Sequence, residues 1–274
     1  MKVVLFCGGL GMRMREGAGS APKPMAMIGD RPLLWHVMRY YAHFGHTEFI
    51  LCLGYGAAAV KEYFLRYDET LSNDFTLTGG GRELELHSAD ITDWKITFID
   101  TGLHASIGER LLRVRAHVAD EPMFLANYAD TLTDVRLPDM IERFRSAEHA
   151  AACLLAVPPV STHHLLDLGD GGTVRQVRPA RQVMQWENGG YFIMRPTVFD
   201  ALREGEDLVP HALNRLARAG ALMAYPLDGF WRAADTFKDR VELEEMYQRG
   251  QCPWMVWDPQ RSGARASATP APVV

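Results

Sequence analysis

The stretch VVLFCGGLGMR at residues 3–13, followed by PKPM at residues 22–25, decides how this chain folds. An apolar run of strand length ends abruptly in a loop that contains three glycines. Glycines let the backbone approach a ligand closely and turn its N–H groups toward it. The cations Arg13 and Lys23 lie just beyond, and positive side chains beside free N–H groups suit a polyphosphate. The alternative is a glycine-rich turn without a ligand, which is the commoner outcome for such a short motif on its own.

The composition is that of a soluble globular protein. The chain has 274 residues, of which 47% are hydrophobic and 23% charged, enough for one large α/β domain or two small ones. The net charge of −5 gives no reason to expect a nucleic acid or an anionic membrane as a partner. Four widely spaced cysteines without a C-x-x-C pair indicate buried, reduced thiols. No signal-peptide pattern or membrane-length apolar run is present, and we expect a cytoplasmic protein.

Strand-like runs alternate with helical patterns through the first half of the chain. The strand-like runs cover residues 2–7, 48–53, 95–100 and 123–128. Apolar residues recur at helical spacing in residues 33–41, 57–67 and 109–118. Runs with so few polar breaks are typical of strands that helices cover on both faces. The alternation predicts a parallel, doubly wound sheet of the α/β class.

The remaining segments depart from this regular alternation. Residues 74–87 hold two short apolar runs around three glycines, which predicts a hairpin or an extended excursion. Further strands are expected at residues 150–157, 164–168, 173–177 and 191–194, and further helices at 140–144, 196–203, 208–219 and 236–249. From residue 259 onward the chain offers little to bury, and we expect a disordered tail over 259–274.

Two aspartates follow strand-like runs and are candidate ligands of a metal ion. In a doubly wound sheet a ligand binds outside the carboxyl ends of the strands, where both the glycine loop and Asp130 are expected. A carboxylate facing a phosphate-binding loop is a natural Mg²⁺ ligand. Asp235 follows GFW at residues 229–231 and is the second candidate. The alternatives are that Asp130 caps a turn and that Asp235 caps the last helix, and sequence spacing alone does not show whether the two meet.

The ordered set of motifs resembles the sugar-1-phosphate nucleotidylyltransferases, and within them most closely the glucose-1-phosphate cytidylyltransferases. The family pattern GGxGTRL…KP is matched at residues 8–14 and 22–25, and IGDRPLLWHVM at residues 28–38 is similar to IGGKPILWHIM of the cytidylyltransferases. Further matches lie at residues 61–64, 100–102, 188–192, 229–236 and 250–254. The resemblance covers everything but the tail. It implies a single nucleotidyltransferase domain over residues 1–258, with a nucleotide-binding half at about 1–135 and a sugar-phosphate-binding half at about 136–258.

This family has a Rossmann-like, doubly wound mixed sheet with helices on both faces. The resemblance implies that an NTP, with CTP favoured, donates a nucleotidyl group to a sugar 1-phosphate or a close analogue, releasing pyrophosphate with Mg²⁺ as cofactor. A sugar-phosphate oxygen attacks the α-phosphorus in line, so the protein mainly positions two anions and offsets their charge. Related enzymes are oligomers, and a homo-oligomer is expected here.

The resemblance also assigns roles to individual residues. Arg13, Lys23 and Asp130 are the expected catalytic residues, and Asp130 and Asp235 are the expected Mg²⁺ ligands. The expected nucleotide-binding residues are Gly8, Gly9, Gly11, Thr101, Gly102 and Arg110, and the expected sugar-phosphate-binding residues are Arg178, Asn188 and Gly189.

Several positions depart from the family pattern. Met12 replaces a Thr and removes a possible phosphate contact, and Ala21 replaces the first Lys of K-P-K-P. Glu109 brings a carboxylate near the nucleotide segment. Ala129 replaces the Gly of Y-G-D, although alanine does not adopt positive φ as readily as glycine.

The departure with the largest consequence is at the family's E-K-P motif, whose Glu bonds sugar hydroxyls and whose Lys grips the sugar phosphate. It is matched by Val177-Arg178-Pro179, so a cation remains and the acid is missing. The match needs a gap, which leaves Arg175 and Arg181 as alternatives to Arg178. A site without that Glu is expected to prefer a sugar other than glucose. The rival interpretation is a non-catalytic relative that binds a nucleotide or a sugar phosphate as a regulatory protein.

Overall fold

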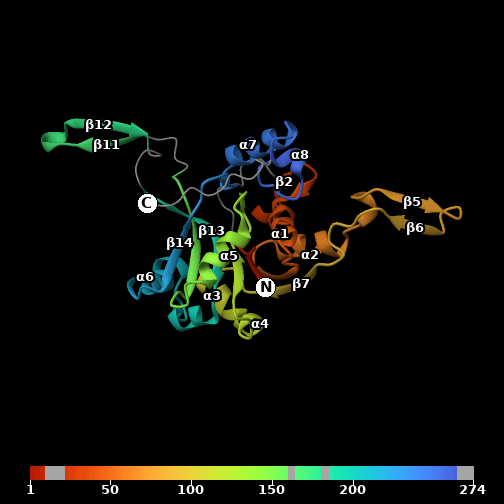
Figure 1. Ribbon diagram of the computed structural model, residues 1–274, viewed down its shortest axis with the longest axis horizontal. Helices are drawn as coiled ribbons and strands as arrows, with labels where there is room; N and C mark the ends of the chain where they lie inside the picture. Colours follow the sequence, from red (N-terminus) through yellow and green to blue (C-terminus); the bar gives the residue numbers. More distant parts are fainter. Residues whose placement is uncertain (10–21, 160–163, 180–184, 264–274) are drawn as a thin grey trace.

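The computed structural model describes residues 1–9, 22–159, 164–179 and 185–263. Its centre is a seven-stranded sheet in the order β14-β10-β13-β8-β1-β4-β7 (Figure 1). The strands are β1 (Val3–Phe6), β4 (Glu48–Leu53), β7 (Lys95–Asp100), β8 (Phe124–Asn127), β10 (Ala152–Val157), β13 (Glu187–Met194) and β14 (Leu222–Pro226). Within this sheet β13 runs antiparallel to both neighbours, whereas the other pairs are parallel. The mixed α/β sheet of the family is confirmed, and the four strands of the predicted alternation, β1, β4, β7 and β8, are parallel as expected.

Helices cover both faces of the sheet because successive side chains of each strand point to opposite faces. On one face Val3 and Leu5 pack against α1 (Leu33–His43) and α5 (Leu137–Arg145). On the other face Val4 and Phe6 pack against residues of α3 (Ile107–Arg113), α4 (Arg115–Val118), η6 (Pro196–Ala201), η7 (Leu208–Leu213) and α6 (Asn214–Arg218). The predicted doubly wound arrangement is therefore confirmed.

Short elements complete the described chain. The helices among them are η2 (Lys23–Met25), α2 (Ala57–Leu65), η3 (Glu69–Leu71), η4 (Asp170–Gly172), α7 (Phe237–Gln248) and α8 (Pro259–Ser262). Four two-stranded pairs lie outside the central sheet: β2 (Met27–Ile28) with β3 (Arg31–Pro32), β5 (Phe75–Thr78) with β6 (Glu83–Leu86), β9 (Thr131–Thr133) with β15 (Trp231–Ala233), and β11 (His164–Leu168) with β12 (Val174–Pro179).

The strand order creates a switch point between β1 and β8. From β1 the chain builds outward through β4 to β7 and then returns to place β8 on the other side of β1. Loops that leave two such strands diverge, and the crevice between them is where doubly wound sheets bind ligands. Gly8 and Gly9 follow β1 and Asp130 follows β8, so both expected site segments border this crevice. The sheet contains strands from both expected functional halves, because β8, before residue 135, pairs directly with β13, after it.

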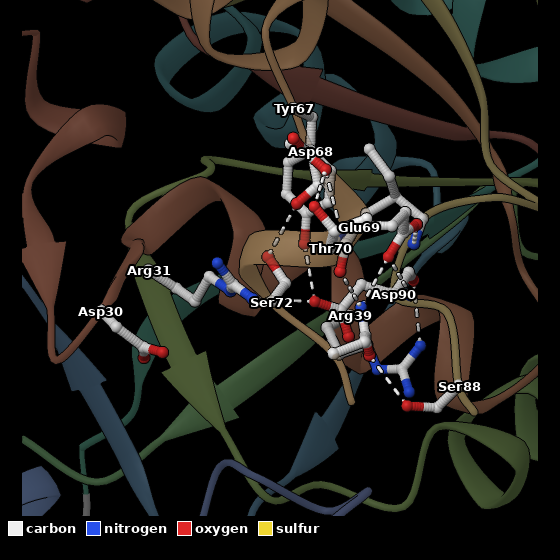
Figure 2. Close-up of polar contacts among 12 residues, drawn as sticks. Asp30, Arg31, Arg39, Tyr67, Asp68, Glu69, Thr70, Ser72, Ser88 and Asp90 are labelled. Carbon is white, nitrogen blue, oxygen red and sulfur yellow. Dashed lines mark hydrogen bonds and ion pairs between the residues drawn. The ribbon is translucent and has the colours of Figure 1, made fainter. Parts of the chain in front are cut away.

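Two ribbons project from opposite ends of the body (Figure 1). The β5–β6 ribbon confirms the hairpin predicted for residues 74–87. The contacts at its base centre on Asp90 and Glu69 (Figure 2). The Asp90 carboxylate accepts hydrogen bonds from Arg31 Nη2 at 2.9 Å and from the Tyr67 hydroxyl at 2.6 Å. The Glu69 carboxylate accepts from the backbone N–H groups of Asp90 and Ile91 at 2.8 and 2.9 Å. The chain is therefore fixed to the body where it enters and leaves this ribbon.

The end of the described chain corrects the predicted start of the tail. Pro259–Ser262 form helix α8, and the Asp258 side chain accepts from the backbone N–H groups of its first turn. The backbone N–H of Cys252 donates to the Arg261 carbonyl at 2.8 Å, which ties this helix to the preceding segment. Residues 264–274 lie outside the described residues. Nowhere in the described part of the chain is a helix both long enough and apolar enough to cross a membrane.

Candidate functional site

Lys23 lies at the carboxyl end of the sheet and holds two carboxylates around its ammonium group. Its Nζ is 2.6 Å from Asp130 Oδ2 and also donates to Asp235 Oδ1. Asp130 precedes β9 and Asp235 follows β15, and these two strands pair with each other. The backbone N–H of Ala234 donates to the Asp130 carbonyl at 2.9 Å. The structure therefore brings together three candidates that lie far apart in the sequence.

The charges of this cluster depend on one another. The side chains of Lys23 and Asp130 are only 13% and 21% exposed, whereas that of Asp235 is 53% exposed. Burial disfavours the ammonium charge, but the two carboxylates outweigh it and raise the pKa of Lys23. Burial raises the pKa of Asp130, and Lys23 opposes that rise. Lys23 therefore remains cationic at neutral pH and reduces the repulsion between the two carboxylates.

Asp130 and Asp235 also form a donor set that fits Mg²⁺. This ion is usually held by one or two carboxylates together with waters and substrate phosphates. In the described ranges no group of three or more His, Cys, Asp and Glu side chains is arranged to hold a metal ion. Asp130 and Asp235 could supply two carboxylate ligands to such an ion, and phosphate oxygens and waters would supply the others.

A cavity of about 260 Å³ adjoins this cluster. It is lined by Phe6, Gly9, Lys23, Pro24, Ile107, Tyr128 and Asp130. Apolar walls with a few charged groups at one side are typical of a site for a small molecule. Tyr128 and Ile107 were not among the predicted site residues. Tyr128 could have been found from the sequence, because it lies two positions before Asp130 at the end of a predicted strand.

The Arg110 side chain fills the space behind Gly8. Its guanidinium donates to the carbonyls of Gly8 at 3.0 Å and Leu53 at 3.1 Å, and to Thr101 Oγ1 at 2.6 Å. Arg110 is 2% exposed and Thr101 is fully buried. A Cβ on Gly8 would lie 2.1 Å from Arg110 Nη1. Both side chains therefore join the ends of β1, β4 and β7, and the nucleotide-binding role expected for Arg110 and Thr101 stays a prediction.

The other glycines of the predicted nucleotide segment differ in their surroundings. Gly9 is exposed at the cavity, and a Cβ there would meet nothing within 4 Å. Gly102 has a φ of +87°, and a Cβ on it would lie 2.5 Å from Arg113 Nη1. Gly11 and Arg13, with the altered positions Met12 and Ala21, lie outside the described residues.

The carboxylate of Glu109 caps a helix. It accepts from the Ser106 backbone N–H at 2.7 Å, while Ser106 Oγ accepts from the Glu109 N–H at 3.2 Å. This reciprocal pair is a capping box at the start of α3. The Glu109 carboxylate therefore has a structural role at the start of α3, and its expected position near the nucleotide stays a prediction.

Ala129 adopts the left-handed conformation that its side chain was expected to prevent. Its φ is +62°, which costs an alanine about 1 kcal/mol relative to the right-handed region. The Asn127 side chain accepts from the Ala129 N–H at 2.6 Å and stabilises the turn. The turn leads directly into Asp130, so the strain occurs where a catalytic residue was predicted.

The residues expected at the sugar phosphate separate into two groups. Asn188 donates through Nδ2 to the Tyr128 hydroxyl at 2.9 Å, which links it to the cavity wall. Gly189 is buried behind that wall, and its carbonyl accepts from the Trp231 indole at 2.8 Å. Arg178 is exposed on β12 opposite Leu165, and it makes no hydrogen bond or ion pair with Lys23, Asp130 or Asn188. Arg175 is also exposed on that ribbon, and Arg181 lies outside the described residues.

Comparisons with known proteins agree with this geometry. No protein-family model matches the chain. It is 38% identical over 261 residues to a probable glucose-1-phosphate cytidylyltransferase of Bacillus subtilis (strain 168), which covers 94% of this chain and 100% of that protein. Identity is 36% over 263 residues, with the same coverage, to a glucose-1-phosphate cytidylyltransferase of Salmonella typhimurium.

Solved structures share the fold at lower identity. HddC from Yersinia pseudotuberculosis superimposes with a TM-score of 0.62 and 19% identity over 90% of this chain and 99% of that one. UTP-bound UGPase from Acinetobacter baumannii gives a TM-score of 0.66 and 18% identity over 90% and 92%. These likenesses show a common α/β architecture.

Replacing Arg110 by Met should lower the free energy of unfolding by about 3 kcal/mol, because buried carbonyls that the guanidinium satisfies would lose their partners. The measurement is urea denaturation followed by circular dichroism. Arg66→Met is the matched control, because that arginine is 79% exposed in its ion pair with Glu62. Equal stabilities for the two variants would contradict the structural role of Arg110.

Proposed function

The chain belongs to the sugar-1-phosphate nucleotidyltransferase family, and we propose that it uses CTP as donor, Mg²⁺ as cofactor and a sugar 1-phosphate other than glucose 1-phosphate as acceptor. The observation that carries the proposal is the convergence of Asp130 and Asp235 on Lys23 at the switch point of the sheet. The preference for CTP is supported by the two full-length relatives, which are both named as cytidylyltransferases.

The reaction joins two anions, and the site residues counter their repulsion. An oxygen of the sugar phosphate forms a bond to the α-phosphorus of the NTP while the bond from that phosphorus to the pyrophosphate oxygen breaks. Asp130 and Asp235 would hold Mg²⁺, which when bound neutralises phosphate charge and orients the leaving group. The Lys23 ammonium lies at the edge of the same cavity, where it can contact phosphate oxygens of both substrates. Arg13 keeps its proposed role on the NTP phosphates.

The acceptor is proposed to bind on the side of Tyr128 and Asn188. Asn188 Nδ2 and the Tyr128 hydroxyl are 2.9 Å apart, and Asn188 Oδ1 accepts from the Gly190 N–H at 2.9 Å. Because the Tyr128 hydroxyl accepts from Asn188, its own O–H can donate to another group. Arg178 remains the proposed contact to the sugar phosphate. The absence of the family's Glu beside it motivates the choice of a sugar other than glucose.

The rival interpretation as a non-catalytic regulatory protein loses part of its motivation. Its basis was the altered Thr, Glu and Gly positions, and the two altered Gly positions have structural explanations. Glu109 is used to cap α3, and Ala129 adopts the left-handed turn that the family builds with Gly. Lys23, Asp130 and Asp235 are present and in contact.

We further propose that the enzyme is a homo-oligomer in the cytoplasm. One face of the β5–β6 ribbon carries Leu77 opposite Leu84, which are 55% and 48% exposed. The β11–β12 ribbon similarly carries Leu166 opposite Val177, 55% and 56% exposed. An isolated two-stranded ribbon is marginally stable in water, so a second copy that covers these faces would stabilise both. The four unpaired, buried cysteines support a reducing compartment.

The substrate proposal predicts a specific pattern in a pyrophosphate-release assay over pairs of NTPs and sugar 1-phosphates. CTP should give a kcat/KM about tenfold or more above the other NTPs, since a site that bonds one base leaves polar groups unpaired with another. Activity should disappear with a chelator and return with Mg²⁺. Nucleotide binding without turnover for any pair would favour the regulatory alternative.

Asp130→Asn and Asp235→Asn should each lower kcat/KM by about a hundredfold or more, because each removes a charge that positions the phosphates and the metal ion. Both variants should fold, since Lys23 keeps one carboxylate partner in each. The control is Asp139→Asn, whose side chain is 50% exposed in an ion pair with Arg136. A variant at Asp130 or Asp235 with the wild-type rate would refute the assignment.

The assembly proposal predicts that Leu77→Ser combined with Leu84→Ser weakens association, because it removes the apolar face of the β5–β6 ribbon. Light scattering after size-exclusion chromatography gives the mass of each variant. Thr76→Ser combined with Glu85→Gln alters the directly paired residues on the opposite face and serves as control. A wild-type protein that is monomeric at all concentrations would contradict the proposal.

A further inference from the structure

The Lys23 ammonium occupies the position between Asp130 and Asp235 that a divalent cation would have to share. We infer that Lys23 acts as an internal counter-ion that keeps this carboxylate pair closed to metal ions until nucleotide phosphates draw its ammonium away. The inference rests on the proposed function, because it takes these two carboxylates as the metal ligands. It adds that the Lys23 ammonium leaves the two carboxylates before the metal ion binds to them.

Geometry provides the first step of the argument. One nitrogen contacts a carboxylate oxygen from each aspartate, and its distance to Asp130 Oδ2 is 2.6 Å. A bound Mg²⁺ needs oxygen ligands at about 2.1 Å, so an ion held by both carboxylates would lie close to the ammonium. Two cations on the same pair of carboxylates repel each other strongly in a partly buried site. The ammonium must therefore move before the metal ion binds well.

Charge balance provides the second step. Two carboxylates and one ammonium carry a net charge of −1, and the addition of a divalent ion would bring the cluster to +1. Lys23 and Asp130 are 13% and 21% exposed, so solvent compensates this excess mainly at Asp235, which is 53% exposed. The phosphates of an NTP bring several negative charges and give the ammonium a new partner. Metal and nucleotide are therefore expected to bind together more favourably than the metal ion alone.

The local structure restricts the movement to the side chain. Lys23 opens the η2 turn, in which its carbonyl accepts from the Ala26 N–H at 3.0 Å and the Pro22 carbonyl accepts from the Met25 N–H at 2.8 Å. Pro22 and Pro24 flank Lys23 and further restrict the backbone. The four-carbon stem of a lysine is flexible, so its ammonium can exchange carboxylate partners for phosphate oxygens while the turn stays in place.

The experiment measures Mn²⁺ binding to the full chain without nucleotide, by electron paramagnetic resonance of the free ion. Wild-type protein should bind Mn²⁺ weakly. Lys23→Gln should bind it about tenfold or more tightly, because no charge-assisted hydrogen bonds then compete for the carboxylates. Lys23→Arg keeps a cation and should remain weak. Lys95→Gln is the matched control, since that lysine pairs with a single carboxylate, Glu48, at 3.0 Å on the surface.

A second set of measurements keeps the inference separate from folding and from the proposed function. If Lys23→Gln is destabilised, Mn²⁺ should raise its melting temperature more than that of the wild type, and Lys23→Gln combined with Asp130→Asn should lose this response. Equal Mn²⁺ affinities for wild type and Lys23→Gln would overturn the counter-ion role while the metal site stands. Absence of Mn²⁺ binding in every variant, and in the wild type with CTP, would overturn both.

Discussion

The interaction on which this site depends is the ammonium group of Lys23 held between Asp130 and Asp235. It joins three parts of the chain: the turn after the glycine loop, the end of β8 and the end of β15. Asp130 and Asp235 face each other because β9 pairs with β15 outside the main sheet. Without a cation between them, two partly buried carboxylates would repel, so the same contact that prepares the chemistry also stabilises the ligand-free fold.

Buried polar contacts hold the surrounding loops in position for this interaction. Arg110 fastens the ends of three parallel strands through their backbone oxygens and leaves no space for a side chain at Gly8. On the other side of the switch point, the Asn127 side chain stabilises the left-handed Ala129 that leads into Asp130. The left-handed turn at Ala129 costs free energy, and it sets the direction in which the chain enters Asp130. Within the described residues, buried contacts therefore fix the backbone on both sides of the cavity.

Much of the fold was predictable where the pattern is local. Glu48–Leu53 and Lys95–Asp100 form strands with the predicted bounds, because each is a continuous run of residues that suit a covered strand. The antiparallel direction of β13 depends on pairing with distant strands, which periodicity does not report. The glycine loop and the strand ends predicted Lys23, Asp130 and Asp235 as candidates, and the family motifs assigned their roles, but their meeting around one nitrogen is a property of the folded chain. The contacts of Arg110 with backbone oxygens could not be predicted, because a buried arginine and an exposed arginine look alike in a motif. Glu109, by contrast, carried a local signal in the capping box with Ser106.

The most direct test of this account is a crystal structure with CTP and Mn²⁺, in which anomalous scattering locates the metal ion. The account predicts a single protein-bound peak coordinated by Asp130 and Asp235, with Lys23 Nζ moved onto phosphate oxygens and the η2 turn unchanged. A metal ion held elsewhere would contradict it, and so would Lys23 Nζ remaining on both carboxylates while the nucleotide occupies the cavity.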